Sequence, residues 1–295
     1  MGKVHRRKEL IVSTTLTGNR EHTITAGLRT VAPMVDKCIV IDTGITDRTL
    51  ELAEQVVGKK LIVRQWPWRE DFSAARNFAL QAAEEAGATW AFTIDSDEVM
   101  YPKPYFSLRR ALDEDDMLVL MTKSADFEYI KERVIKLNSG LYWEGYTHER
   151  LMGAKLNQFA LTLNMVFGEA TKDPLTMRAK CERDVRLLKA YLLKDPKDPR
   201  WYFYLGISLQ NLGRHEEALT YLIRGTKLGD WEREAASCAE RARDSFARLQ
   251  RWDEGIEFYK QAQFVNPGLS ELTLYINDLV IARDKHRAKF GRPLP

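Results

Sequence analysis

The sequence predicts an α/β domain with a mostly parallel sheet, followed by an all-α domain built from helical repeats. Two observations support this division. Short β-branched runs alternate with helical patterns from residue 9 to about residue 95, and strand-like runs disappear after about residue 170 in favour of repeated helical spacing. We therefore assign the two domains to residues 1–170 and 171–295.

Four short apolar runs in the first domain have the length and the β-branched content of buried strands, and turn residues bound each of them. We expect these strands at residues 9–15, 37–43, 61–66 and 89–95. Helical spacing between the strands predicts helices at 20–30, 47–57 and 73–86, the last of them capped by Ser73. Sheets of this kind bind their ligands at the carboxyl ends of the strands.

Three further strand-like runs lie between Met117 and Phe167, with the sequences MLVLMTK, YIKERVIKLN and FALTLNMVF. The pattern there changes from alternating strands and helices to strands. We therefore expect the sheet to become mixed in this region.

The second domain repeats small and apolar residues at the spacing of a tetratricopeptide repeat. The clearest unit contains Leu205, Gly206, Gly213, Ala218, Leu222 and Gly225. A less regular unit contains Phe246, Gly255, Tyr259, Ala262 and Pro267. Small residues let two helices pack closely, and apolar residues fill the seam between stacked repeats. We expect an irregular array of two to three units, which offers a surface for a protein partner or for a homodimer.

The overall composition excludes several classes of protein. With 45 basic and 42 acidic residues the net charge is only +3, which disfavours nucleic acid and anionic membranes as partners. The cysteines Cys38, Cys181 and Cys238 lie far apart, which argues against a disulfide framework and a thiolate metal site. The apolar run after the basic MGKVHRRKEL segment is too short for a signal or a membrane span. We therefore expect a cytoplasmic protein.

Acidic residues gather directly after the apolar run 90–94, at Asp95, Asp97 and Glu98. Carboxylates this close repel one another, so a cation is expected beside them. Positions i and i+2 of a strand face the same side, which would let Asp95 and Asp97 face one divalent ion. Oxygen ligands suit Mg²⁺ and Mn²⁺, which commonly bind substrate phosphates as well. The competing interpretation is a solvated turn after a strand.

Two more segments place charged residues where a ligand of the sheet would bind. In CIVIDTGITDRT, Asp42 ends an apolar strand and Gly44 permits a tight turn. An acidic residue at a buried strand end needs a hydrogen-bond donor, such as the N–H of a bound pyrimidine. In DFSAARNFAL, Arg76 and Asn77 are expected in the first turn of a helix, whose N-terminus favours anions. A solvated surface arginine is the alternative.

A third segment, WEGYTHERL at residues 143–151, combines aromatic side chains with the adjacent His148 and Glu149. An imidazole or a carboxylate can act as the base that an acceptor nucleophile needs. A surface or packing role is the competing interpretation of this pair. The aromatic rings would suit an apolar platform for a sugar, although core packing explains them as well.

Taken in order, these segments resemble the inverting family-two glycosyltransferases with the GT-A (Rossmann-like) fold, across residues 9–155. The family has a polar strand end, then VDTGSTDRT, PW…DFSAARN and DADE, where this chain has VSTTLTGNRE, IDTGITDRT, PWREDFSAARNFAL and IDSDE. More narrowly, the chain resembles bacterial and phage-borne members with tetratricopeptide-like helices, including peptide S-glycosyltransferases. It departs from the pattern at STTLTGNRE, where many relatives have a KNEE segment, and at Ile45, where a serine is common.

The resemblance implies an enzyme that moves a sugar from a nucleoside-diphosphate donor, UDP-linked in the family-level expectation, to an acceptor with Mn²⁺ or Mg²⁺ as cofactor. The residues then expected to bind the donor are Thr14, Thr15, Asp42, Gly44, Arg76 and Asp95. Asp97 would hold the metal. The expected catalytic pair is Glu149, as the base, and His148, as a further metal or phosphate ligand, while Asp126 and Glu128 remain rivals for the base.

The identity of the acceptor stays open between a glycan, a lipid-linked intermediate and a peptide. A non-enzymatic tetratricopeptide scaffold with a degenerate nucleotide-binding domain is an alternative, but the retained acidic and basic residues argue against it. A phosphatase of the haloacid dehalogenase type is weaker still, because Gly44 replaces the second aspartate of its D-x-D-x-T signature. A nucleotidyltransferase would need a Gly-rich basic loop that TTLTGNREH does not provide.

Overall fold

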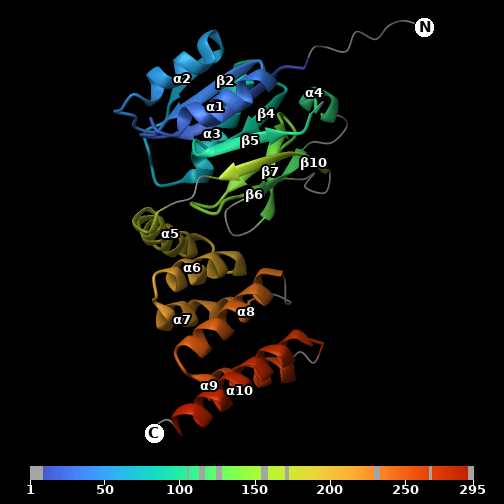
Figure 1. The fold of residues 1–295 in the computed structure, drawn as a ribbon. Helices are drawn as coiled ribbons and strands as arrows, with labels where there is room; N and C mark the ends of the chain where they lie inside the picture. Colours follow the sequence, from blue (N-terminus) through green and yellow to red (C-terminus); the bar gives the residue numbers. More distant parts are fainter. Residues whose placement is uncertain are drawn as a thin grey trace, which may run out of the picture. The chain divides into compact units, whose positions relative to one another are not determined.

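The computed structural model describes residues 9–104, 106–112, 117–123, 128–153, 159–169, 173–228, 233–265 and 268–291. The chain separates into two compact units, Met1–Lys172 and Asp173–Pro295 (Figure 1). The assignment of two domains to residues 1–170 and 171–295 stays a prediction. No helix within the described ranges is both long and apolar enough to cross a bilayer.

The first unit is built around a mixed sheet, in which eight described strands are paired. These strands are β1 (Ile11–Thr17), β2 (Lys37–Asp42), β3 (Leu61–Gln65), β4 (Trp90–Thr93), β5 (Glu98–Pro102), β6 (Met117–Lys123), β7 (Glu128–Lys136) and β10 (Phe159–Glu169). Their order in the sheet is β3-β2-β1-β4-β7-β6-β10-β5. The first four are parallel, and β7 and β5 run against their neighbours. The predicted mostly parallel sheet that becomes mixed is therefore confirmed.

The helices of this unit are α1 (Ile24–Val31), α2 (Thr49–Val57), α3 (Phe72–Glu85) and the short α4 (Leu108–Ala111), with 3-10 turns at Ala32–Met34 and Gly58–Lys60. The three longer helices confirm the predicted alternation, but the cap of α3 was predicted wrongly. Asp71, not Ser73, caps α3, because its Oδ1 accepts the Ala74 N–H at 2.9 Å. The Ser73 hydroxyl donates to the same oxygen at 2.7 Å.

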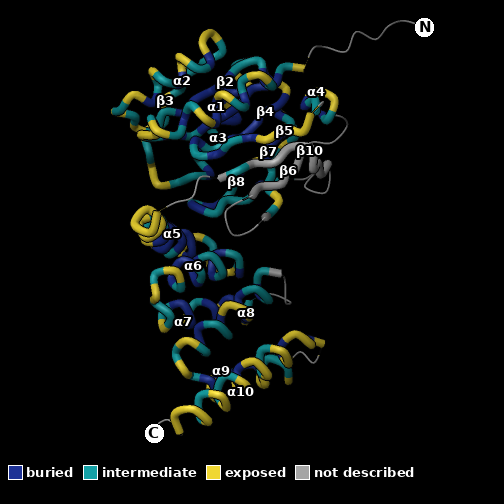
Figure 2. The backbone as a smooth tube through the Cα atoms, in the orientation of Figure 1, coloured by how far each residue is buried: buried dark blue, intermediate teal, exposed yellow. Residues whose placement is uncertain are grey.

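The sheet carries a hydrophobic core on each face, as expected of strands with helices on both sides. Alternate residues of β1 and β2 face opposite cores. Ile11 and Val40 pack on the face of α1 and α2. Val12 and Ile39 pack on the other face, against the alanine-rich side of α3. Figure 2 shows the buried strands inside the unit, with exposed residues on the outer side of the helices.

A separate two-stranded hairpin, β8 (Tyr142–Glu144) and β9 (Arg150–Met152), lies against α3. Its strands are antiparallel, with Trp143 opposite Leu151. Both residues are buried in the core on the α3 side of the sheet. The hairpin loop, residues 145–149, is thereby anchored at both ends.

The second unit is helical, with α5 (Pro174–Lys194), α6 (Pro199–Asn211), α7 (His215–Thr226), α8 (Arg233–Arg248), α9 (Trp252–Val265) and α10 (Glu271–Phe290). Glycines lie where helices cross most closely. A Cβ at Gly206 would overlap the Leu222 side chain, and one at Gly225 would lie 2.6 Å from Cys238 Sγ. A Cβ at Gly255 would lie 2.7 Å from Leu279 Cδ1. This confirms tetratricopeptide-like helices packed through small residues.

Candidate functional site

The charged motifs meet near the carboxyl ends of the parallel strands of the first unit. Asp42 is the last residue of β2, and Asp95 follows β4, which ends at Thr93. Glu149 comes from the β8–β9 hairpin, immediately before β9. Arg76 reaches Asp95 and Glu149 from α3. This is the edge of the sheet at which an α/β fold is expected to bind its ligand.

Arg76 joins two carboxylates that are far apart in the sequence. Its Nη2 donates to Asp95 Oδ1 at 3.0 Å, and its Nε donates to Glu149 Oε1. The side chain is only 7% exposed, and the guanidinium carbon lies 5.4 Å from the centre of the Trp143 ring. Its third nitrogen, Nη1, is buried and has no hydrogen-bond partner among the described residues. A buried donor without a partner is unfavourable, so this atom is suited to receive an acceptor oxygen from a ligand.

The ion pairs change the acidity of all three groups. Burial raises the pKa of Asp95 and Glu149, but the charges of Arg76 and Lys131, together with hydrogen bonds, outweigh burial and lower both pKa values below their usual range. Lys131 strengthens the effect, since its Nζ lies 3.3 Å from Asp95 Oδ2. Burial alone would lower the pKa of Arg76, whereas Asp95 and Glu149 raise it. At neutral pH the cluster is therefore fully ionised.

A second, fully buried ion pair stabilises the turn that carries Asp95 and Asp97. Both Arg133 terminal nitrogens donate to Glu98, Nη1 to Oε2 at 2.7 Å and Nη2 to Oε1 at 2.6 Å. Glu98 Oε2 also accepts the Asp95 backbone N–H at 2.8 Å. Burial and the Asp95 charge raise the pKa of Glu98, and Arg133 opposes this rise. The glutamate of the IDSDE motif therefore holds the turn rather than facing a ligand.

Helix α1 approaches the same turn through Gly27. A Cβ at Gly27 would lie 2.7 Å from the Glu98 carbonyl oxygen, closer than real side chains come. The Met100 backbone N–H donates to Thr30 Oγ1 of the same helix at 3.2 Å. The turn that carries Asp95 and Asp97 is thus packed directly on the helix backbone.

The hairpin loop that carries His148 and Glu149 is fastened to α3. The Asn77 amide donates to the Trp143 carbonyl at 2.9 Å and accepts the Trp143 N–H at 2.7 Å. The Phe72 N–H donates to the Tyr146 carbonyl at 3.0 Å. His148 has a φ of 52°, a conformation that non-glycine residues rarely adopt and that often occurs at functional sites.

The Asp42 carboxylate already has donors from its own turn. Its Oδ1 accepts the N–H groups of Gly44 at 2.8 Å and Ile45 at 2.7 Å. Gly44 has a φ of 119°, which only glycine adopts easily. The expected need of Asp42 for an external donor is therefore met for one oxygen, and Oδ2 has no hydrogen bond to any described residue.

The two threonines expected beside the nucleoside lie inside β1 rather than at its end, because the strand runs to Thr17. Both are buried. Thr14 Oγ1 lies 3.5 Å from Thr93 Oγ1 on the neighbouring strand, two residues before Asp95. Thr15 Oγ1 is buried without a hydrogen-bond partner in the described part of the chain.

The structure corrects three further expectations about the acidic site. Asp97 lies in the turn after β4, so the i, i+2 geometry of a strand does not place it beside Asp95. The cations that relieve carboxylate repulsion at Asp95 are the chain's own Arg76 and Lys131. Arg76 is the fifth residue of α3, so it lies in the second turn rather than the first.

The possible metal ligands of this site fit a hard divalent ion only if the substrate supplies further ligands to the same ion. No group of three or more His, Cys, Asp or Glu side chains suited to a metal occurs among the described residues. Both Asp95 oxygens already accept hydrogen bonds. Asp97 and His148, the other expected ligands, are half-buried. Mg²⁺ and Mn²⁺ are commonly bound by one or two carboxylates together with substrate phosphates, so Asp97 fits such an ion.

Sequence reasoning missed the residues that complete the site: Asn77 as a clamp, Lys131 and Arg133. A signal for the two basic residues was present, because positions two apart on a strand-like run face the same side. The fold does not decide between Glu149 and the other two candidates for the catalytic base. Asp126 lies outside the described residues, and Glu128 is the first residue of β7.

Comparison with known proteins identifies the family. The sequence pattern of glycosyl transferase family 2 matches residues 15–168. A TPR repeat-containing protein of Synechococcus elongatus is 27% identical over 219 residues, which cover 68% of this chain and 53% of that protein. The SPbeta prophage-derived glycosyltransferase SunS of Bacillus subtilis is 25% identical over 221 residues, which cover 69% of this chain and 50% of that protein. The chain therefore spans about half the length of the curated relatives it matches.

Among solved structures, Staphylococcus aureus TarS 1-349 aligns with 95% of this chain and 92% of its own, at 14% identity and a TM-score of 0.46. The family pattern, by contrast, covers more than half of the 295 residues, including the motifs around Asp42, Arg76 and Asp95. This family match confirms the resemblance to family-two glycosyltransferases and the fold class that were inferred from those motifs. The chain belongs to glycosyl transferase family 2.

Proposed function

We propose that the protein transfers a sugar from a nucleoside-diphosphate donor, UDP-linked, to an acceptor nucleophile with inversion at the anomeric carbon and with help from a divalent metal. The observation that carries the proposal is the Arg76 bridge between Asp95 and Glu149 at the rim of the sheet. It joins the SAARN, DSDE and HER segments of the sequence into one buried, charged site.

In this proposal the donor lies across the ends of β1, β2 and β4. The base and ribose are bound by Asp42 Oδ2, the turn at Gly44 and the buried hydroxyls of Thr14 and Thr15. Asp95, fixed by Arg76, faces the ribose or the donor sugar. Arg76 Nη1 would donate a hydrogen bond to an anionic or polar oxygen of the sugar nucleotide. This nitrogen is buried and has no hydrogen-bond partner among the described residues.

Asp97 would hold Mn²⁺ or Mg²⁺, with His148 as an additional ligand of metal or phosphate. When bound, the ion neutralises charge on the diphosphate leaving group. The protein's own contribution is to keep Asp97 on a turn that Glu98, Arg133 and α1 hold rigidly. A fixed geometry is what such a site requires, because preorganised charges need no reorganisation during the reaction.

Glu149 is the proposed base that removes the proton of the acceptor nucleophile. Its lowered pKa keeps the carboxylate ionised at neutral pH and therefore able to accept a proton. Its contact with Arg76 and its place on the clamped hairpin loop fix its position. The acceptor itself, a glycan, a lipid-linked intermediate or a peptide, is not selected by these contacts.

The test is an Asp97→Ala variant, assayed for hydrolysis of UDP-sugars and for their stabilisation of the fold with and without Mn²⁺. We expect the variant to keep the wild-type melting temperature and to lose both hydrolysis and the Mn²⁺-dependent part of donor stabilisation. Glu54→Ala, at an exposed carboxylate of α2 without a side-chain interaction among the described residues, serves as a matched control and should behave as wild type. Wild-type turnover in Asp97→Ala, or no effect of any sugar nucleotide on the wild-type protein, would refute the proposal.

A further inference from the structure

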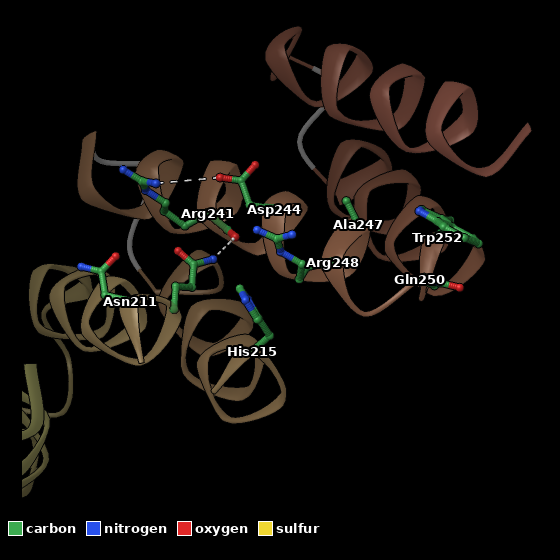
Figure 3. A pocket seen from close by; sticks show the side chains of 9 residues that line it. Asn211, His215, Arg241, Asp244, Ala247, Arg248, Gln250 and Trp252 are labelled. Atoms are coloured by element: carbon green, nitrogen blue, oxygen red, sulfur yellow. Dashed lines mark hydrogen bonds and ion pairs between the residues drawn. The ribbon is translucent and has the colours of Figure 1, made fainter. Parts of the chain in front are cut away.

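The helical unit contains an open pocket of about 650 Å³, separate from the residues proposed to bind the donor (Figure 3). It lies where the turn between α6 and α7 approaches the end of α8 and the start of α9. The residues that line it are Gln210, Asn211, His215, Arg241, Asp244, Ala247, Arg248, Gln250 and Trp252. All of them belong to the second unit.

The pocket carries positive charge that the described part of the chain does not neutralise. Asp244 is the one acidic residue in its lining, and Arg243 Nη2, outside the pocket, already donates to it at 2.9 Å. Arg241 Nη1 lies 3.8 Å from the other Asp244 oxygen. Arg248 is exposed and has no ion pair or hydrogen bond with any described residue. The guanidinium group of Arg248 is therefore available to an anion. Among the described residues, that of Arg241 is held only by its 3.8 Å contact with Asp244, which Arg243 already neutralises.

The acidic residues that start the adjoining helices do not cancel this charge. Arg251 Nη1 lies 2.5 Å from Glu216 of α7, and Arg251 Nη2 lies 2.5 Å from Glu254 of α9. Glu217 is paired with Lys189 and Arg214. Each of these carboxylates has a basic partner outside the lining of the pocket, so none is left to compensate Arg248.

The polar groups of the pocket are also incompletely satisfied. His215 Nδ1 is buried and finds no hydrogen-bond partner among the described residues. His215 starts α7, and the residue before it provides no side-chain cap for the free N–H groups of the first turn. Asn211 and Gln250 add exposed side-chain amides at the edge of the pocket, and neither side-chain amide has an interaction with a described residue. Figure 3 shows His215 and Arg248 among the side chains that line the pocket.

We propose that this pocket is a docking site for an acidic polypeptide segment, with aspartate or glutamate carboxylates bound by Arg248 and Arg241. Arginine recognises carboxylates through paired N–H groups, and the amide side chains match the hydrogen-bonding groups of a peptide backbone. The volume exceeds what a single phosphate needs, and the net charge of only +3 does not suit a polyanion such as nucleic acid. The proposal does not depend on the transfer reaction.

The experiment measures binding of fluorescein-labelled hexaglutamate to the full chain by fluorescence anisotropy at low salt, with hexaglutamine as the uncharged probe. The variants are Arg248→Gln, Arg241→Gln and the double variant. Arg29→Gln is the matched control, because Arg29 is an exposed arginine of α1 without an interaction among the described residues. Circular dichroism checks that each variant keeps the wild-type melting temperature, which is expected since the two pocket arginines are exposed.

We expect hexaglutamate to bind wild type and Arg29→Gln equally, and to bind the double variant about tenfold or more weakly, because two charge-assisted contacts are lost. Added salt should weaken binding to wild type. Undiminished binding to the double variant, or equal binding of hexaglutamine, would overturn the proposal. Displacement of the peptide by inorganic phosphate at an equal concentration of charge would also overturn it, by indicating a site for small anions.

Discussion

The Nη2 atom of Arg76 donates to Asp95 Oδ1 at 3.0 Å, and the Nε atom of the same side chain donates to Glu149. One buried guanidinium thus connects a helix, the turn after a central strand and a hairpin loop. Cutting this connection affects stability as well as any chemistry at the site. The consequences for the individual residues can be measured separately.

Replacement of Arg76 by methionine is expected to cost about 3–5 kcal/mol of unfolding free energy, because Glu149 would stay buried without this guanidinium and Asp95 would keep only Lys131 as a basic partner. Urea unfolding provides the measurement. Adding Glu149→Gln to Arg76→Met should recover part of the loss, since one uncompensated charge disappears. An Arg76→Met protein as stable as wild type would show that the bridge is not formed in solution.

Replacement of Glu149 by glutamine is expected to reduce kcat by about 10²–10⁴-fold if this carboxylate is the base, because general base catalysis typically contributes that much. The affinity for the donor should change little, since glutamine keeps the size and one acceptor oxygen. Steady-state kinetics with isothermal titration of the donor separate the two quantities. A parallel loss of donor affinity would instead make Glu149 a ligand of the donor.

The Glu98–Arg133 pair is expected to act as a support, with no direct contact to substrate. Glu98→Gln removes the carboxylate to which both terminal nitrogens of the fully buried Arg133 donate, which should cost about 3–5 kcal/mol. The double variant Glu98→Gln/Arg133→Met should be more stable than Glu98→Gln alone. Equal stability of the single and double variants in urea unfolding would argue against a coupled pair.

Asn77 is expected to control the position of the hairpin loop. Asn77→Ala removes two hydrogen bonds to the Trp143 backbone and leaves buried groups unsatisfied, at a cost of about 1–3 kcal/mol. Asn77→Asp keeps the acceptor for the Trp143 N–H but places a carboxylate against the Trp143 carbonyl. We expect both variants to lose stability and turnover together. Full turnover in Asn77→Ala would show that the loop is held by other contacts.

Asp173 is expected to make the stability of the helical unit depend on pH. Its carboxylate caps α5, and hydrogen bonds from the Thr176 hydroxyl and from backbone N–H groups lower its pKa. A pKa lowered by folding gives stability that is present above the unfolded-state pKa and is lost as the pH falls. Asp173→Asn keeps a capping oxygen but cannot titrate, so its melting temperature should fall less between neutral and acidic pH. An equal fall in both proteins would contradict this role.

The strand and helix order could be predicted because each element has a local signature. The β-branched run of β2 and the alanine-rich face of α3 define their elements without knowledge of the rest of the chain. The ends were less accurate: β1 runs from Ile11 to Thr17 instead of ending at residue 15, because its pairing with β2 continues to Asp42. Tertiary pairing of this kind is not encoded in a short window of sequence.

The members of the site were largely identifiable, but their contacts were not. Arg76, Asp95 and Glu149 were each chosen on local grounds, and only the fold shows that the arginine neutralises both acids. Lys131 and Arg133 lie two positions apart in a strand-like run, so the alternation of that run was the one signal that pointed to them. The sequence therefore suggested a metal as the partner of Asp95, while two basic side chains from other elements already occupy its oxygens.

The close approach of Gly27 to the Glu98 carbonyl ties the acidic turn to a position about seventy residues upstream. Any side chain at residue 27 would push the first helix and the acidic loop apart, even though the residue carries no charge and is not among those proposed to bind the donor. Changes that alter turnover can therefore arise in a helix with no chemical group of its own. A library of variants confined to charged residues would therefore miss a position that controls the geometry of the acidic turn.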